Sequence, residues 1–114
     1  MSRSRTTIEE KRAPAAMADD IRATKRVTTH PGAYLKAEFL EPLGVSATAL
    51  AIEIGVPPNR LTEMVSGRRN MTADTALRLA NRLGTSPEFW MNLQSLHDLS
   101  KAVVAARGRR AKAA

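Results

Sequence analysis

Apolar side chains between residues 28 and 97 recur at spacings of three and four, and no run there alternates apolar with polar residues. This spacing places the apolar groups on one face of an α-helix, whereas a half-buried strand needs strict alternation. Glycine and proline divide the stretch into segments joined by links of about 2–8 residues. The sequence therefore predicts an all-α domain built from five short helices.

Residues that favour helix ends mark the expected boundaries. Serine and threonine side chains cap a first turn, proline is tolerated there, and glycine adopts the left-handed conformation that ends a helix. The expected starts are His30-Pro31, Ser46, Pro57-Pro58, Thr72 and Ser86-Pro87. The expected ends of the first four helices are Pro42, Gly55, Gly67 and Gly84.

Each expected helix carries an apolar stripe that faces a common core. The inward positions are Leu35, Phe39 and Leu40; Leu50, Ala51 and Ile54; Leu61, Met64 and Val65; Leu77, Ala80 and Leu83; and Phe89, Trp90, Leu93 and Leu96. A domain of this size buries only about 60% of its chain surface on folding, which leaves apolar groups at its boundary. We therefore expect a homodimer whose interface includes Trp90, Leu93 and Leu96.

The net charge of +7 lies outside the helical domain. Residues 28–97 carry six basic and six acidic side chains, whereas residues 1–27 carry a net charge of +3 and residues 98–114 carry +4. A basic protein favours polyanionic partners such as nucleic acid. The expected organisation is a flexible basic N-terminal arm (1–27), the helical domain (28–97), and a helix end with a basic C-terminal tail (98–114).

Composition argues against several classes of function. Cysteine is absent, the histidines His30 and His97 lack the spacing of metal ligands, and the glycines form no phosphate-binding loop. No segment approaches the about 20 apolar residues of a membrane span, and the N-terminus lacks the apolar region of a secretion signal. We expect a cytoplasmic protein that is not an enzyme and has neither cofactor nor metal.

Residues 47–64 have the spacing of a helix-turn-helix. This motif joins two steeply crossed helices through about 3–4 residues, with a small residue where the backbones approach and a glycine in the turn. Ala51 and Gly55 fit these two roles, and Val56, Leu61 and Met64 supply the apolar contacts. An ordinary helical hairpin can show the same features, so these positions alone leave both interpretations open.

Six motifs lie within residues 30–99: HPG, FLEPLG, IGVPP, SGRR, TADTALRLA and GTSPEFWMNLQ. In combination they resemble the HigA family of antitoxins, which belongs to the phage-repressor-like (XRE-type) helix-turn-helix proteins. The resemblance implies a five-helix phage-repressor-like fold and a dimeric, DNA-binding antitoxin that represses its own operon. It also implies a HigB-like toxin as partner, a ribosome-dependent mRNA interferase. The resemblance reaches neither the arm nor the tail.

The third expected helix is the candidate recognition helix for the major groove. Its polar face carries the four residues that we predict to read bases, namely Asn59, Arg60, Thr62 and Glu63. Asparagine pairs with adenine, arginine with guanine, and a carboxylate accepts from cytosine. Glu63 would also need a cytosine or an arginine partner near the phosphates. The alternative is that this polar face is only solvated.

Phosphate contacts are expected on both sides of the recognition helix. Ser46 begins the second helix, and the turn after the recognition helix contains Arg68, Arg69 and Asn70. Such contacts fix the docking of a protein on DNA without reading its sequence. The alternative is an exposed, solvated basic turn.

The sequence leaves two questions about function open. The first is whether the chain is an antitoxin or a stand-alone XRE-type transcriptional regulator; an adaptor without DNA would leave the SGRR turn unexplained. The second is how a toxin would be held. Either the arm forms a helix on the toxin, or the helical domain holds the toxin while the arm adds DNA affinity. A toxin-bound helix would use Glu9, Glu10, Met17, Asp19, Asp20 and Ile21. Added DNA affinity would instead come from Arg3, Arg5, Lys11 and Arg12.

Overall fold

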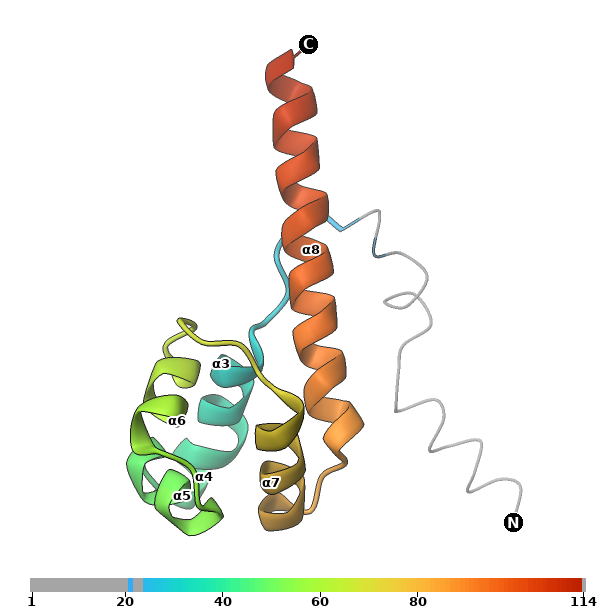
Figure 1. The fold of residues 1–114 in the computed structure, drawn as a ribbon. Coiled ribbons are helices and arrows are strands. Elements are labelled where there is room, and N and C mark those ends of the chain that lie inside the picture. Colours follow the sequence, from blue (N-terminus) through green and yellow to red (C-terminus); the bar gives the residue numbers. More distant parts are fainter. Residues whose placement is uncertain (1–20, 22–23, 114) are drawn as a thin grey trace, which may run out of the picture. The chain divides into compact units, whose positions relative to one another are not determined.

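The computed structural model describes residue 21 and residues 24–113, with side chains up to residue 110, and over this range it contains helices and no strand (Figure 1). The chain divides into one unit of Thr28–Asp98 and another of Met1–Val27 with Leu99–Ala114. The first unit contains α3 (Pro31–Leu35), the π-helical turn η2 (Lys36–Leu40), α4 (Glu41–Leu43), α5 (Ala47–Ile54), α6 (Pro58–Val65) and α7 (Ala73–Leu83). The last helix, α8 (Pro87–Ala113), begins in this unit and ends in the other. The predicted all-α class is confirmed.

Local side-chain chemistry sets most helix boundaries as expected. Three predicted cap residues accept hydrogen bonds from backbone N–H groups three residues later, namely Ser46, Thr72 and Ser86. Gly55 and Gly84 end α5 and α7 with φ angles of 77° and 78°, a region that side chains disfavour.

The predicted end of the first helix at Pro42 is wrong. The chain stays helical through η2 and α4 and ends at Gly44, which has a φ of 67°. In a regular α-helix a proline ring clashes with the carbonyl four residues earlier. Here that carbonyl lies in the wider π turn, where the Glu41 N–H donates to the Lys36 carbonyl five residues back. The wider turn lets the helix continue through Pro42.

The core of the first unit gathers apolar side chains from α3, η2, α5, α6, α7 and the start of α8, and from two linking segments. Its buried members are Leu35, Leu40, Leu50, Ala51, Ile54, Val56, Leu61, Met64, Met71, Ala76, Leu79 and Trp90. The four aromatic rings of the chain form one cluster with centroids 5.0–6.4 Å apart, made of Tyr34, Phe39, Phe89 and Trp90. The start of α8 therefore packs against α3 and η2 through this aromatic cluster.

Trp90 is not available for the dimer interface that the sequence predicts. Its side chain is 0% exposed, and its indole N–H donates to the Thr85 hydroxyl at 2.7 Å. The ring therefore packs entirely within the core of the first unit. Leu93 and Leu96, the other two predicted interface residues, are half-buried and keep part of their surface.

Leu77, predicted to face inward, is 55% exposed. The buried face of α7 consists of Thr75, Ala76, Leu79 and Ala80 instead. Thr75 can be buried because its hydroxyl accepts a hydrogen bond from the Thr72 hydroxyl at 3.2 Å. A satisfied polar residue thus takes a core position, and the helix turns Leu77 toward solvent.

Residues expected to form a tail after the last helix belong to α8, which continues to Ala113. Alanine, lysine and arginine dominate its last turns, and all three are strong helix formers. In the part of the chain that the structure describes, no helix is both long and apolar enough to cross a membrane.

Candidate nucleic-acid interface

Helices α5 and α6 are joined by a short turn where the spacing of small residues left a helix-turn-helix and an ordinary hairpin both open. Ala51 is fully buried between them, and Gly55 turns the chain in the left-handed conformation. The N–H of Val56 then donates to the Ala51 carbonyl at 3.0 Å, which completes the end of α5. Pro58 starts α6 after only two linking residues beyond Gly55. The turn is short and its start is closed by backbone hydrogen bonds, so it restricts the direction of α6.

The far end of α6 is held by a close approach of the HPG segment. A Cβ atom added to Gly32 would lie 1.8 Å from the backbone oxygen of Met64. The Gly32 N–H is itself bonded to the His30 ring nitrogen Nδ1 at 2.9 Å. Only glycine permits this contact, so α3 and α6 pack backbone to backbone.

The structure places the four predicted base-reading residues outside the core. Asn59 is exposed, and Arg60, Thr62 and Glu63 are half-buried. On the opposite side of α6, Leu61 and Met64 are completely buried. The polar face is therefore presented by a helix whose other face is locked in the core.

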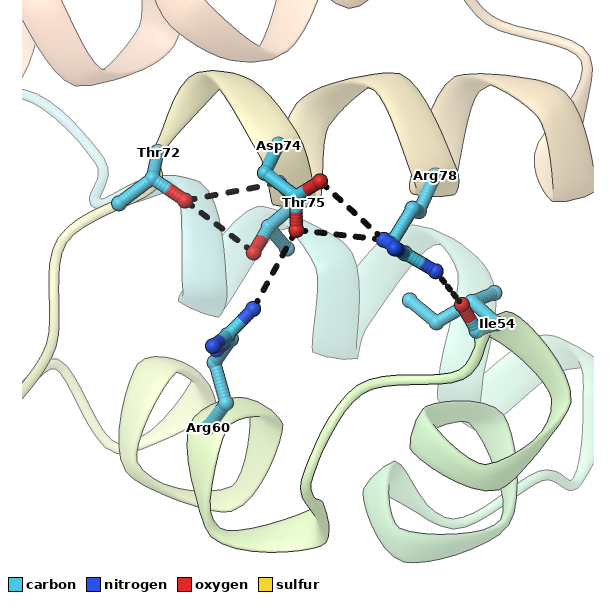
Figure 2. Close-up of polar contacts among 6 residues, drawn as sticks. All are labelled: Ile54, Arg60, Thr72, Asp74, Thr75 and Arg78. Carbon is cyan, nitrogen blue, oxygen red and sulfur yellow. Dashed lines mark hydrogen bonds and ion pairs between the residues drawn. The ribbon is translucent and has the colours of Figure 1, made fainter.

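Arg60 is tied to two other helices through a carboxylate on α7 (Figure 2). Its Nη1 donates to Oδ2 of Asp74 at 3.4 Å. The same carboxylate accepts from Nε of Arg78 at 3.2 and 3.3 Å. Arg78 in turn donates from Nη1 to the carbonyl of Ile54, the last residue of α5, at 2.9 Å. One network therefore links α5, α6 and α7 beside the recognition face.

Glu63 has the arginine partner that a carboxylate on this face needs. Arg69 donates to Glu63 Oε1 from Nη2 at 2.7 Å and from Nε at 3.0 Å. The Ser66 hydroxyl and the Arg68 N–H both donate to the Glu63 backbone carbonyl, at 2.9 and 2.8 Å. These bonds fold the SGRR turn back onto the last turn of α6.

The four predicted phosphate contacts differ in their surroundings. The Ser46 hydroxyl caps α5, and the Asn70 side-chain oxygen accepts from Gln94 on α8 at 3.3 Å. Arg69 shares its charge with Glu63. Arg68 is exposed and has no ion-pair partner within residues 24–110. It is therefore the cation of this set best placed to meet a phosphate.

His97 is half-buried on α8 and contacts the start of the first unit. Its Nδ1 lies 2.7 Å from the Thr28 carbonyl oxygen, and its ring meets His30 edge to face with centroids 5.0 Å apart. The pair joins the start of the first unit to α8. No group of three or more potential metal-ligating side chains is found in the described part of the chain.

Sequence reasoning missed Asp74 and Arg78 as part of the site. Their spacing of four on one helix predicts an ion pair between them. The link to Arg60, fourteen residues earlier, depends on how α7 packs beside α6 and has no local signal.

Comparisons with known proteins agree with this geometry. A helix-turn-helix family model matches residues 36–90. The chain is 47% identical over 73 residues to virulence-associated protein I of Dichelobacter nodosus, covering 64% of this chain and 68% of the relative. It is 44% identical over 79 residues to antitoxin HigA-1 of Vibrio cholerae, covering 69% and 74%. The solved structure of the Pseudomonas aeruginosa antitoxin HigA with the higBA promoter matches with a TM-score of 0.68 and 40% identity, covering 75% of this chain and 90% of that chain. The chain therefore belongs to the HigA family of helix-turn-helix antitoxins.

Proposed function

We propose that this chain is the antitoxin of a HigBA-like type II toxin-antitoxin system and a sequence-specific repressor of its own operon. The observation that carries the proposal is the presentation of α6, with Asn59 and Arg60 in its first turn and Leu61 and Met64 locked in the core. The Pseudomonas aeruginosa HigA, a relative at 40% identity, was solved with promoter DNA. The protein would act in the bacterial cytoplasm, on the nucleoid when bound to its operator.

In this proposal the first turn of α6 reads base edges in the major groove. Asn59 and Arg60 pair with adenine and guanine, and Thr62 and Glu63 restrict which bases are accepted. Ser46, Arg68 and Asn70 contact phosphates. Arg69 contributes less than Arg68, because Glu63 offsets its charge.

We infer that the DNA-binding form is a homodimer. Two recognition helices about 34 Å apart are needed to read both halves of a palindrome. The half-buried Leu93 and Leu96 on α8 are the candidate interface residues. Sedimentation at tens of micromolar should show a dimer, and a monomer that stays monomeric on operator DNA would exclude this arrangement.

The second partner is a HigB-like toxin that cleaves mRNA on the ribosome. The arm residues considered for toxin contact lie outside the described residues, except Ile21. Hydrogen exchange decides between the two mechanisms. Protection of residues 15–26 on adding toxin would support the arm. Unchanged exchange there, with full neutralisation by a chain that starts at Val27, would assign the toxin to the helical domain.

A DNA-binding measurement tests the repressor, and co-expression tests the antitoxin. The full chain should bind the duplex upstream of its own gene more tightly than a scrambled duplex of equal length at elevated salt, where non-specific binding weakens. Co-expression should restore growth to cells that express the protein of about 90–110 residues encoded by the neighbouring reading frame. Operator binding without such a neighbour would favour the stand-alone regulator.

A further inference from the structure

We propose that Asp74 is a positioning residue for Arg60, and that it controls sequence discrimination from a helix outside the helix-turn-helix. The proposal rests on the proposed function, because it assumes that Arg60 reads a base. Its physical basis is the juxtaposition of one carboxylate with two guanidinium groups from two helices (Figure 2).

The carboxylate of Asp74 is itself held in place. It lies in the first turn of α7, where the helix dipole favours a negative charge and the Thr72 side chain caps the helix. Both of its oxygens accept from Nε of Arg78. Arg78 cannot swing away freely, because its Nη1 is bonded to the Ile54 carbonyl. Asp74 therefore offers Arg60 a fixed acceptor.

Arg60 gains an orientation from this acceptor. Its side chain is 33% exposed, so packing already restricts the aliphatic part. The ion pair uses Nη1, and a guanidinium carries five N–H donors in a planar fork. Donors remain for the two hydrogen bonds that guanine accepts in the major groove. Ordering the side chain before DNA arrives removes part of the entropy loss that binding would otherwise require.

Because Asp74 is negatively charged, the proposal predicts opposite effects of its removal on DNA affinity and on sequence discrimination. The side chain is 60% exposed and negative on a molecule that approaches phosphates, so its charge opposes binding to any DNA. Its removal should leave binding to random DNA unchanged or tighter. If Asp74 positions Arg60, the same removal should weaken discrimination. General damage to the fold would weaken both.

Asp74→Asn in the full chain tests this pair of effects by fluorescence anisotropy. The probes are the duplex upstream of the gene, versions with single G·C pairs replaced, and a random duplex. The operator-to-random ratio should fall roughly 2- to 10-fold, the range that corresponds to ordering one long side chain. Among the duplexes with single G·C pairs replaced, only the one that changes the pair read by Arg60 should lose its affinity difference from the operator. Asp74→Glu, which keeps the acceptor, should retain more of the ratio than Asp74→Asn.

Glu53→Gln is the matched control. Glu53 pairs with Arg82 and so also joins α5 to α7 through one carboxylate and one arginine. The substitution removes the same charge and the same kind of pair without touching Arg60. The operator-to-random ratio should therefore stay at the wild-type value. In an Arg60→Ala background, Asp74→Asn should cause no further fall in the ratio.

Three results would overturn the positioning role: an unchanged ratio in Asp74→Asn, an equal fall in Glu53→Gln, or a fall that persists when Arg60 is absent. An unfolding curve for each variant separates these results from loss of structure. A wild-type chain that binds operator and random duplexes equally would instead contradict the proposed function, so the two failures are distinguishable.

Discussion

The helical domain and its flanking segments handle positive charge in opposite ways. Residues 28–97 are neutral, and four of their six basic side chains stand in ion pairs, namely Arg60, Arg69, Arg78 and Arg82. The flanking segments carry the whole net charge of +7. Paired arginines have defined positions, whereas excess charge attracts any polyanion. In the proposed function, the first kind of charge suits sequence reading and the second adds affinity for any DNA.

Composition alone therefore misleads about where specificity lies. The basic excess is the compositional signal for nucleic acid, yet it falls outside the helix-turn-helix. Inside that motif, Arg60, which we propose reads a base, is joined to the carboxylate of Asp74. A neutral surface with fixed polar groups is suited to sequence discrimination, because it adds little electrostatic attraction to DNA of any sequence.

The largest effect should come from closing the space between α3 and α6. Gly32→Ala would place a methyl group 1.8 Å from the Met64 carbonyl oxygen, and no side-chain rotation can relieve an overlap between a Cβ atom and the backbone. We expect a decrease of about 3 kcal/mol in the free energy of unfolding, at the upper end of overpacking costs. Urea unfolding followed by circular dichroism measures it. A variant as stable as the parent would show that α3 and α6 can move apart without cost.

The second effect concerns base reading. Arg60→Ala should reduce discrimination between operator and random DNA by about 1–3 kcal/mol, the usual value of a bidentate base contact. Binding to random DNA should change little, because Asp74 already offsets the charge of Arg60. Competition between the two duplexes gives both numbers. An equal weakening on both would identify Arg60 as a phosphate contact.

The flanking segments should show the reverse behaviour. Deleting residues 1–26 and 108–114 removes basic residues and should flatten the dependence of affinity on salt, by about 0.9 in the logarithmic slope for each phosphate that is no longer neutralised. Discrimination should remain. Affinity measured over a range of salt concentrations provides the slope. A shortened chain that fails to discriminate would instead place sequence reading outside the helical domain.

A smaller effect distinguishes two adjacent arginines. Arg68→Ala should reduce the salt slope by about 1, because Arg68 is exposed and, in the described part of the chain, is not in an ion pair. Arg69→Ala should change it less, since Glu63 already offsets that charge. The same salt titration compares them. Equal slopes for both variants would mean that DNA separates Glu63 from Arg69.

Much of the fold follows from local chemistry. Hydroxyl caps at Ser46 and Thr72 and left-handed glycines at Gly55 and Gly84 act over one helical turn, so sequence spacing predicts them. Pro42 escaped prediction because its tolerance depends on a π turn that widens the helix. Helix ends set by an interaction within one turn were predicted, whereas the helix end at Pro42 was not, because it depends on the conformation of the preceding turn.

The same distinction explains the site. The polar face of α6 was predictable because Leu61 and Met64 define the opposite face of one short helix. The link from Arg60 to Asp74 was not, because two helices had to be packed before their side chains could meet. Leu77 and Trp90 belong to this second class, since tertiary packing decides which face of α7 is buried and which aromatic ring fills the centre.

The smallest expected effect repeats the first substitution in a flanking segment. Gly108 lies within α8, and a Cβ added there meets nothing within 4 Å. Alanine is favoured over glycine inside a helix by about 0.5–1 kcal/mol. Gly108→Ala should therefore stabilise its helix where Gly32→Ala disrupts the domain.

The stabilisation by Gly108→Ala can be confined to the end of α8 or extend to the helical domain. Gly108 and the helical domain belong to different units, so a local gain in helix should raise the ellipticity at 222 nm and leave the urea midpoint of the domain unchanged. A midpoint that rises with the ellipticity would mean that the end of α8 unfolds together with residues 28–98. The two regions would then share one cooperative transition, and their contrast would be limited to charge.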